Sequence, residues 1–486
     1  MYFPSKEHLR ETVPKGYTAS LCKRLGLKIE PVDAYAALRA GGYAFLLESA
    51  RTGPDTGRYS FVGSEPALIF KSKGDEVEIL NGTGTRKFRA DPIKELKGIF
   101  ERYKYAGDTS APFTGGACGY FGYDLCRRFE KVSSLAKDDT AIPDIFLIFS
   151  DTVVAFDHLK KDIKIISAVH NKGSFDRAYD DARERIERAE ERLVRVRSTE
   201  HRAQRKSGSR KVGNKIESNL TKSAFENMVR KAKRYIKAGD IYQANLSQRL
   251  CARTDVEPLD LYKVLRKVNP SPFACLLEFG EIAVVSSSPE RLLKFDGRRV
   301  DTRPIAGTRP RGKTRFDDRR FSRELLLNEK ERAEHIMLVD LERNDLGRVC
   351  EYGSVKVNEL MAIEEYSHVI HIVSNVRGRL RKDKDRFDLL RAAFPGGTIT
   401  GTPKVRCMQI IDELEPVMRG IYTGSIGYLG YNGNMDLNIV IRTFLIHKNR
   451  AYVQVGAGIV ADSDPEREYR ETLYKAEALI ETLEMA

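Results

Sequence analysis

The chain has 486 residues, of which 83 are Lys or Arg and 69 are Asp or Glu, so its formal net charge is +14. No apolar run approaches the roughly 18–20 residues that a membrane-spanning helix needs, and the start of the chain lacks a signal-peptide pattern. The seven cysteines are scattered without a C-x-x-C pair, which argues against a disulfide framework or a zinc site. These features exclude membrane, secreted and fibrous classes and predict a large cytoplasmic globular protein.

The positive charge is concentrated in residues 183–215, whose first half mixes Glu and Arg at helical spacing. The second half is rich in Ser, Gly, Lys and Arg, which is typical of a flexible linker. An RNA-binding arm is the alternative, but no aromatic side chains lie among these charges to stack on bases. We therefore expect no nucleic acid partner, and three regions: an N-terminal region of residues 1–180, a charged helix and flexible linker of residues 181–219, and a C-terminal region of residues 220–486.

In chain order, strand-like runs bounded by turn residues occupy 43–48, 67–71, 145–149, 152–156 and 163–168. Helical patterns are predicted at 92–103, 222–238 and 466–484. Strands and helices do not alternate regularly, so the pattern predicts an α+β fold with large antiparallel sheets rather than a doubly wound fold.

Two acidic pairs of equal spacing stand on predicted helices, Glu331 with Glu334 and Glu468 with Glu471. Residues three apart share one face of a helix, and Lys475 lies on the same face as Glu471. Glutamates are also common in the first turn of a helix because of its dipole, so each pair taken alone is more often structural. Two facing pairs of carboxylates would nevertheless make a good Mg²⁺ site.

Two further patterns leave alternatives open. Gly456, Ala457 and Gly458 interrupt a predicted strand, where the glycines either let a ligand approach the backbone or mark a bulge or tight sheet packing. The run 366–373 alternates like a strand, so His368 and His371 point to opposite faces and cannot share a metal ion. A lone strand histidine is usually structural.

An ordered series of motifs resembles the chorismate-utilising enzymes, and within them the anthranilate synthase component I branch. The motifs are IKAGDIYQ at 236–243, SPE at 288–290, RPIAGTRPRG at 303–312, KERAEHIMLVDLERNDLGRV at 330–349, YSHVIH at 366–371, TGTPK at 400–404, GIYTG at 420–424, IRT at 441–443 and GAGIVADSDP at 456–465. LLES at 46–49 and GGACGY at 115–120 extend the resemblance into the N-terminal region. It implies two large packed, mainly antiparallel sheets flanked by helices, with the active site in the cleft between them.

The resemblance implies conversion of chorismate and ammonia to anthranilate and pyruvate, the first step of tryptophan biosynthesis. Mg²⁺ would be held by Glu334 and Glu471, assisted by Glu331 and Glu468. Glu290 would be the general acid for the departing hydroxyl, a role that needs a raised pKa, which crowding by other acids would favour. The other implied catalytic residues are His368, Gln243 and Thr308, and the implied substrate contacts are Gly307, Thr308, Thr400, Tyr422, Arg442, Gly456, Ala457, Gly458 and Lys475.

Two positions separate the relatives within this family. Water-using members carry a lysine base where this chain has Gln243, whose neutral amide cannot deprotonate water. Aminodeoxychorismate synthases typically carry a nucleophilic lysine where this chain has Ala306. The resemblance thus favours an anthranilate-forming enzyme, with aminodeoxychorismate synthase component I as the alternative.

Partners and regulation are also implied by the resemblance. No glutaminase motif of the G-x-C-x-G-x-Q kind is present, so ammonia would come from solution or from a glutamine amidotransferase subunit (component II) in a hetero-oligomer.

The family's pocket for feedback inhibition by L-tryptophan corresponds to Ser49 and to Pro272, Phe273 and Ala274. Ala274 departs from the methionine usually found there, which bears on how tightly the inhibitor would bind.

Overall fold

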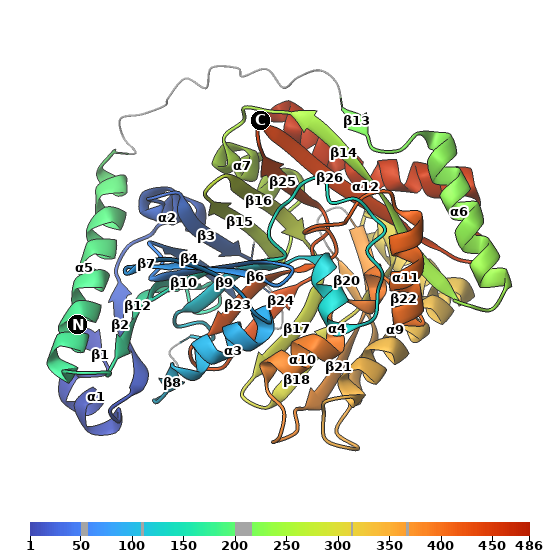
Figure 1. Cartoon of the computed structure of the whole chain (residues 1–486). Helices are drawn as coiled ribbons and strands as arrows, with labels where there is room; N and C mark the ends of the chain where they lie inside the picture. The colour runs from blue at the N-terminus through green and yellow to red at the C-terminus, as the bar shows by residue number, and fades with distance from the viewer. Residues whose placement is uncertain (50–56, 108–110, 200–215, 313, 366–368) are drawn as a thin grey trace.

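The computed structural model describes residues 1–49, 57–107, 111–199, 216–312, 314–365 and 369–486 (Figure 1). Within these ranges the strands form two large sheets, one of 14 strands and one of 12. Their pairings are antiparallel except for the short parallel pair β2 with β8. No helix in the described part of the chain is long and apolar enough to cross a membrane.

The larger sheet, sheet A, has the strand order β1-β2-β12-β11-β4-β3-β15-β16-β25-β26-β14-β13, with β8 and β22 attached beside it. Its strands are β1 (Tyr2–Phe3), β2 (Tyr17–Leu25), β3 (Tyr43–Glu48), β4 (Tyr59–Ser64), β8 (Lys104–Tyr105), β11 (Thr152–Asp157), β12 (Asp162–His170), β13 (Glu217–Ser218), β14 (Gln243–Arg253), β15 (Phe273–Phe279), β16 (Ile282–Ser288), β22 (Gly401–Thr402), β25 (Thr443–His447) and β26 (Arg450–Ile459).

The second sheet, sheet B, has the strand order β19-β21-β18-β17-β24-β23-β9-β10-β5-β6-β7, with β20 paired to β21. Its strands are β5 (Leu68–Lys73), β6 (Glu76–Asn81), β7 (Gly84–Arg89), β9 (Gly116–Phe121), β10 (Ile145–Ser150), β17 (Arg291–Asp296), β18 (Arg299–Arg303), β19 (Ile305–Pro310), β20 (Lys356–Glu365), β21 (Val369–Arg379), β23 (Ser425–Gly430) and β24 (Met435–Asn438).

Helices cover the outer faces of the sheets and flank their ends (Figure 1). They are α1 (Lys6–Thr12), α2 (Pro31–Leu38), α3 (Pro92–Glu101), α4 (Cys126–Phe129), α5 (Phe175–Thr199), α6 (Lys222–Lys237), α7 (Pro258–Val268), α8 (Arg315–Leu327), α9 (Glu329–Gly347), α10 (Arg386–Ala393), α11 (Lys404–Leu414) and α12 (Pro465–Met485), with two 3₁₀ turns, η1 (Tyr123–Leu125) and η2 (Gly397–Ile399).

The core is layered because strands alternate their side chains between two faces. On β10, Phe146 and Ile148 belong to the apolar cluster between the sheets, which also holds Phe45 of β3 in sheet A. Their neighbours Leu147 and Phe149 belong to the cluster on the other face of sheet B. Both faces of these central strands are therefore buried, which explains why they read as continuous apolar runs in the sequence.

Both sheets draw strands from both ends of the chain. In sheet A, β3 pairs with β15, placing Leu46 opposite Leu276. In sheet B, β9 pairs with β23, placing Gly119 opposite Gly427. The regions 1–180 and 220–486 thus share both sheets, and the boundary in the sequence is not a boundary between two cores.

Most predicted elements are present. The expected strand 43–48 is β3 to the residue, the helix 92–103 ends two residues early as α3, and the helix 466–484 is α12. The charged helix is α5, which begins before the predicted region, at Phe175. The flexible half of the predicted linker falls on 200–215, outside the described residues. The α+β fold class with two mainly antiparallel sheets is confirmed.

Candidate active site

A pocket of about 590 Å³ lies between the two sheets. Sheet A contributes β14 and β26 to its lining, and sheet B contributes β19 and β21. Helices α9 and α12 contribute acidic side chains, and the turn η2 contributes Thr398. Twelve of the predicted site residues line this pocket, namely Gln243, Glu290, Gly307, Glu331, Glu334, Tyr422, Arg442, Gly456, Gly458, Glu468, Glu471 and Lys475.

Helix caps bring the four glutamates into position. The Asn328 side chain accepts the backbone N–H of Glu331 at 3.0 Å and starts α9. Asp464 does the same for Arg467 at 3.0 Å and, with Pro465 next to it, starts α12. These caps satisfy backbone N–H groups that have no partner inside the helix. As a result, the first two turns of both helices present their carboxylates to the same pocket.

Each of these four carboxylates meets a polar partner of the protein. Glu331 accepts from Arg309 at 3.0 Å, and Glu334 accepts from the Gln243 amide at 3.0 Å. Glu471 pairs with Lys475 at 2.8 Å, and Glu468 is hydrogen-bonded to the Ser463 side chain. Among the residues that the structure describes, no three His, Cys, Asp or Glu side chains stand together as a ready metal site.

The four glutamates form one wall of the pocket, and their combined negative charge nevertheless favours a bound cation. Burial raises the pKa of Glu334, and the charges of Glu331 and Glu471 raise it further against the Gln243 hydrogen bond. Burial likewise raises the pKa of Glu468, with repulsion from Glu471 adding to it. Like charges gathered on one wall of a pocket are relieved either by protons or by a bound cation. The predicted Mg²⁺ ligands therefore fit a divalent ion by charge and oxygen chemistry.

Glu290 is the most strongly perturbed carboxyl group of the pocket. It is 5% exposed, and burial raises its pKa to about 8, against the lowering effects of the Thr398 hydroxyl and the Ile305 N–H. The raised pKa agrees with the expected general acid, but its cause differs from the prediction. Burial is the main cause, and the nearby carboxyl of Glu342 contributes less.

Tyr422 and Arg442 stand on loops that are held in uncommon backbone conformations. Arg442 has φ +51°, and Thr423, next to Tyr422, has φ +59°. Left-handed conformations of non-glycine residues cost free energy and recur at functional sites. Tyr422 is 7% exposed, and burial raises the pKa of its phenol to about 12. Its hydroxyl therefore stays protonated and can donate to an anionic group.

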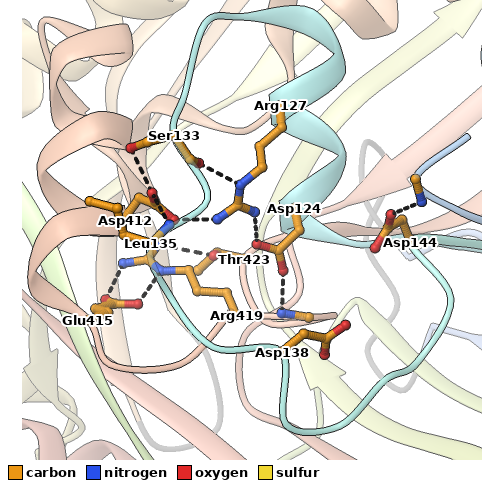
Figure 2. A network of polar contacts seen from close by, with 12 residues as sticks. Asp124, Arg127, Ser133, Leu135, Asp138, Asp144, Asp412, Glu415, Arg419 and Thr423 are labelled. Carbon is orange, nitrogen blue, oxygen red and sulfur yellow. Dashed lines mark hydrogen bonds and ion pairs between the residues drawn. The ribbon is translucent and has the colours of Figure 1, made fainter.

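A buried polar network is centred on Arg419 (Figure 2), whose guanidinium lies 5.5 Å from the centre of the Tyr422 ring. The Arg419 guanidinium donates to both oxygens of Glu415, at 2.9 and 2.7 Å, and to the Thr423 hydroxyl at 3.1 Å. It also donates to the carbonyl oxygens of Asn245, at 2.6 Å, and Ile399, at 3.0 Å. The network fixes the loop that carries Tyr422, because Arg419 ties that loop to two segments beside the pocket.

The same network reaches the N-terminal region of the chain (Figure 2). Arg127 pairs with both Asp124 and Asp412, and Asp124 accepts the backbone N–H of Gly420 at 2.8 Å. Segment 123–135 therefore supports the Tyr422 loop from outside the predicted catalytic region.

The sequence left open whether the glycines of β26 let a ligand approach the backbone or mark tight packing. The structure shows tight packing at both glycines. A Cβ on Gly456 would lie 2.7 Å from the Tyr422 hydroxyl, and one on Gly458 would lie 2.6 Å from the Gln243 amide nitrogen. Close packing therefore requires glycine at both positions. The packed groups are themselves pocket side chains, so the glycines serve the site by letting Tyr422 and Gln243 rest against the strand.

The structure corrects one predicted substrate contact. Thr400 is fully buried, and its hydroxyl donates to the carbonyl oxygens of Gly396, at 2.9 Å, and Gly397, at 3.3 Å, so it braces the turn η2 instead of lining the pocket. The Ala457 side chain packs in the apolar core, because successive residues of β26 point to opposite faces. The predicted contact through the Ala457 backbone amide stays a prediction.

Two other predicted residues have no described place in the pocket. His368 lies outside the described residues, and Thr308 is placed only as a residue of β19.

Sequence reasoning missed His371, which lines the pocket from β21. Its Nδ1 lies 3.3 Å from the Gly307 carbonyl oxygen. Burial, followed by the charge of Arg442, lowers the pKa of His371 to about 4, so the ring is neutral near pH 7. The available signal was the alternating pattern of 366–373, which predicted that His368 and His371 point to opposite faces of a strand. Other lining residues that were not predicted are Asn245, Arg309, Lys330, Thr398 and Gln454.

A second pocket, of about 640 Å³, is lined by all four predicted effector residues, Ser49, Pro272, Phe273 and Ala274. The Ser49 hydroxyl donates to the Pro272 carbonyl oxygen at 3.1 Å. Arg291 lies over the Phe273 ring at 5.1 Å and pairs with Asp436 through two hydrogen bonds, of 3.0 and 3.2 Å. The predicted residues therefore lie together in a pocket with both apolar and charged walls.

Comparison with known proteins agrees with this geometry. Residues 42–481 match the chorismate binding enzyme family. Anthranilate synthase component 1 of Acetivibrio thermocellus is 45% identical over 94% of this chain and 93% of its own length. Aminodeoxychorismate synthase component 1 of Bacillus subtilis is 44% identical over 91% of this chain and 92% of its own.

The fold also has a solved counterpart. The crystal structure of anthranilate synthase component I from Streptococcus pneumoniae superposes with a TM-score of 0.76 at 34% identity, covering 94% of this chain and 98% of that one. The family match covers strands of both sheets and every lining residue of the pocket between them. The chain therefore belongs to the chorismate binding enzymes.

Proposed function

We propose that the chain is the large subunit of an anthranilate synthase, which converts chorismate and ammonia to anthranilate and pyruvate. The observation that carries this proposal is the pair of neutral residues at the two positions that separate the relatives. Gln243 and Ala306 both line the pocket, so neither place offers a lysine as a base or a nucleophile. Ammonia needs no such base, because its lone pair is available for attack.

The first stage adds nitrogen to the ring and removes the hydroxyl. The ammonia nitrogen forms a bond to C2, the ring double bonds shift, and the C4–O bond breaks. The ammonium group formed at C2 then gives one proton to solvent. Glu290 gives its proton to the departing oxygen, which leaves as water. A carboxyl group whose pKa is raised to about 8 by burial holds that proton at neutral pH.

The second stage removes the enolpyruvyl group. The C2–H proton is lost, the C3–O bond breaks and the ring becomes aromatic. The enolpyruvate that leaves takes up a proton at its methylene carbon and becomes pyruvate. His371 is suited to accept the proton, because its imidazole is neutral and lines the pocket. Arg442 and Tyr422 are suited to hold the enolpyruvyl carboxylate, one as a cation and the other as a protonated donor.

The four glutamates would hold Mg²⁺, which when bound would neutralise this wall and grip the ring carboxylate of the substrate. Glu334 and Glu471 would be direct ligands, with Glu331 and Glu468 assisting. Loading would require Gln243, Arg309 and Lys475 to release carboxylate oxygens that they now hold.

We further propose a glutamine amidotransferase subunit as the source of ammonia, and L-tryptophan as a feedback inhibitor bound in the pocket of Ser49 and Phe273. The name of the Acetivibrio relative, a component 1, supports a second component. A cytoplasmic location is supported by the seven cysteines, all of which are free thiols.

The decisive experiment is a product assay on the purified chain with chorismate, MgCl₂ and ammonium chloride at alkaline pH. Fluorescent anthranilate is the expected product. Chelation with EDTA and the variant Glu334→Gln should each abolish its formation, whereas Glu351→Gln, in an exposed ion pair with Arg298 away from the pocket, should retain it. Activity that survives both EDTA and Glu334→Gln would overturn the metal assignment.

The second candidate is aminodeoxychorismate synthase component 1, favoured by the 44% identity to the Bacillus subtilis protein. Accumulation of 4-amino-4-deoxychorismate in the same assay, without anthranilate, would establish it and overturn the anthranilate proposal. Ala306→Lys tests the discriminating position directly, because a lysine there could attack the ring and form a covalent adduct detectable by mass spectrometry.

A further inference from the structure

A second buried carboxyl group, Glu342 of α9, lies behind the pocket. It is 3% exposed. One oxygen accepts the Thr302 hydroxyl at 2.9 Å. The other faces Gly397, where a Cβ would come within 3.6 Å of it. Glu342 does not line the pocket and has no part in the mechanism above.

Glu290 holds the same two segments of chain from the pocket side. It accepts the Ile305 N–H at 3.4 Å and interacts with the Thr398 hydroxyl. Glu342 holds Thr302 and Gly397, so the two carboxyl groups grip neighbouring residues of 302–305 and of 397–398. Ionisation or replacement of one carboxyl group therefore affects the other in two ways, through the position of these segments and through electrostatic repulsion.

The charges around the two groups do not balance. Asp345 is 1% exposed and pairs with the Lys404 ammonium, which also donates to the carbonyl oxygens of Ala393 and Pro395, each at 3.0 Å. Glu342 interacts with this pair. Glu342 and Asp345 thus share the Lys404 ammonium, and isolated buried charges are strongly disfavoured.

The remaining charged groups that face Glu290 are on the pocket side. Arg442 approaches it from the loop before β25 and favours its ionised form, while His371 of β21 is uncharged near pH 7.

We propose that Glu342 is a positioning residue which keeps the acid Glu290 protonated, by adding negative charge behind it and by holding residues 302 and 397 in place. This inference rests on the proposed function, in which Glu290 donates a proton. Repulsion between the two carboxyl groups raises the pKa of Glu290 beyond the effect of its burial. Burial and then Asp345 raise the pKa of Glu342, while Lys404 opposes them.

The test is a pH titration of the free protein by infrared difference spectroscopy of the protonated carboxyl band, assigned with Glu290→Gln. This measurement needs no substrate, so it stands even if the proposed reaction is wrong. In Glu342→Gln the pKa of Glu290 should fall by about one unit, a tenfold rise in its acid dissociation constant, because a neutral amide no longer opposes ionisation. Glu342→Asp keeps the charge and should restore most of the original value.

The matched control is Asp301→Asn, which removes another buried carboxyl group from β18, one that pairs with Arg377 and accepts from Asn375. It should leave the pKa of Glu290 unchanged.

The product assay gives a second readout. In Glu342→Gln the alkaline limb of the kcat/KM profile should move to lower pH by the same amount as the pKa of Glu290. An unchanged Glu290 titration in a folded Glu342→Gln protein, or an equal shift in Glu342→Asp, would overturn the inference.

Discussion

Glu290 and Arg291 are neighbours in the chain, yet they line different pockets. Glu290 lines the pocket between the sheets, and Arg291 lines the pocket that contains Ser49 and Phe273. Strand β24 joins the two pockets a second time. Arg291 pairs with Asp436 of this strand, and the Glu290 carbonyl oxygen accepts the N–H of Ile439, the residue after the strand, at 3.0 Å. Arg291 therefore joins the second pocket to the backbone of the acid Glu290.

Tryptophan binding can be followed directly, because the chain contains no tryptophan. Adding L-tryptophan should give a blue-shifted indole emission as the ring enters the pocket beside Phe273, together with inhibition of anthranilate formation. Ser49→Phe should weaken binding at least tenfold by filling the pocket, whereas Thr85→Phe, on the exposed edge strand β7, should not. An unshifted emission at millimolar tryptophan would show that this pocket serves another purpose.

The pH profile should report the protonation state of Glu290. Because Glu290 acts in its protonated form and its pKa is raised to about 8, kcat/KM measured at constant free ammonia should fall as the pH rises through that value. Glu290→Gln has no proton to give and should lose roughly 10²–10⁴-fold in rate. Chorismate binding to that variant, measured by calorimetry, should persist. A profile that is flat between pH 7 and pH 9 would contradict this role.

Gly456→Ala tests the close packing on β26. The added Cβ would lie 2.7 Å from the Tyr422 hydroxyl and 2.9 Å from the Leu246 carbonyl oxygen. Overpacking of this kind should lower the free energy of unfolding by about 1–3 kcal/mol and raise KM by displacing Tyr422. The control Gly98→Ala, in α3 with open space around its Cβ, should instead stabilise the protein by about 0.5–1 kcal/mol. Urea unfolding measures both effects.

Arg419→Met tests the network centred on Arg419. The Arg419 and Glu415 side chains are 1% and 3% exposed, so the variant leaves a buried carboxylate without its cation. We expect a loss of about 3–5 kcal/mol in the free energy of unfolding. Arg470→Ala removes an ion pair of the same i,i+4 spacing whose side chains are 64% and 47% exposed, and it should cost less than about 0.5 kcal/mol. Similar losses in both variants would refute a special role for burial.

Local patterns predicted much of the fold. Strand β3 could be located to the residue because its apolar run is bounded by turn residues. Pairing could not be predicted this way, since β3 lies beside β15, more than 200 residues further along the chain. Only the packed sheets fix which strands are neighbours, because that choice depends on burying both faces at once.

Within the site, helix periodicity put each pair of glutamates on one face, and the ordered motifs indicated that the two pairs belong together. The sequence could not show that Glu334 meets Gln243 or that burial, more than its acidic neighbours, raises the pKa of Glu290. It also could not distinguish Thr400, which braces a turn, from a substrate contact. Such distinctions depend on where a side chain points and how much water reaches it.

The sequence by itself therefore determined the family, the elements and most of the chemical groups at the site, since these follow from residue type and spacing along one segment. The tertiary structure decided that His371 reaches the pocket, how Arg419 supports Tyr422, and that Glu342 stands behind Glu290. Those relations join segments far apart in the chain, and their strength depends on distance and dielectric, which local sequence patterns do not contain.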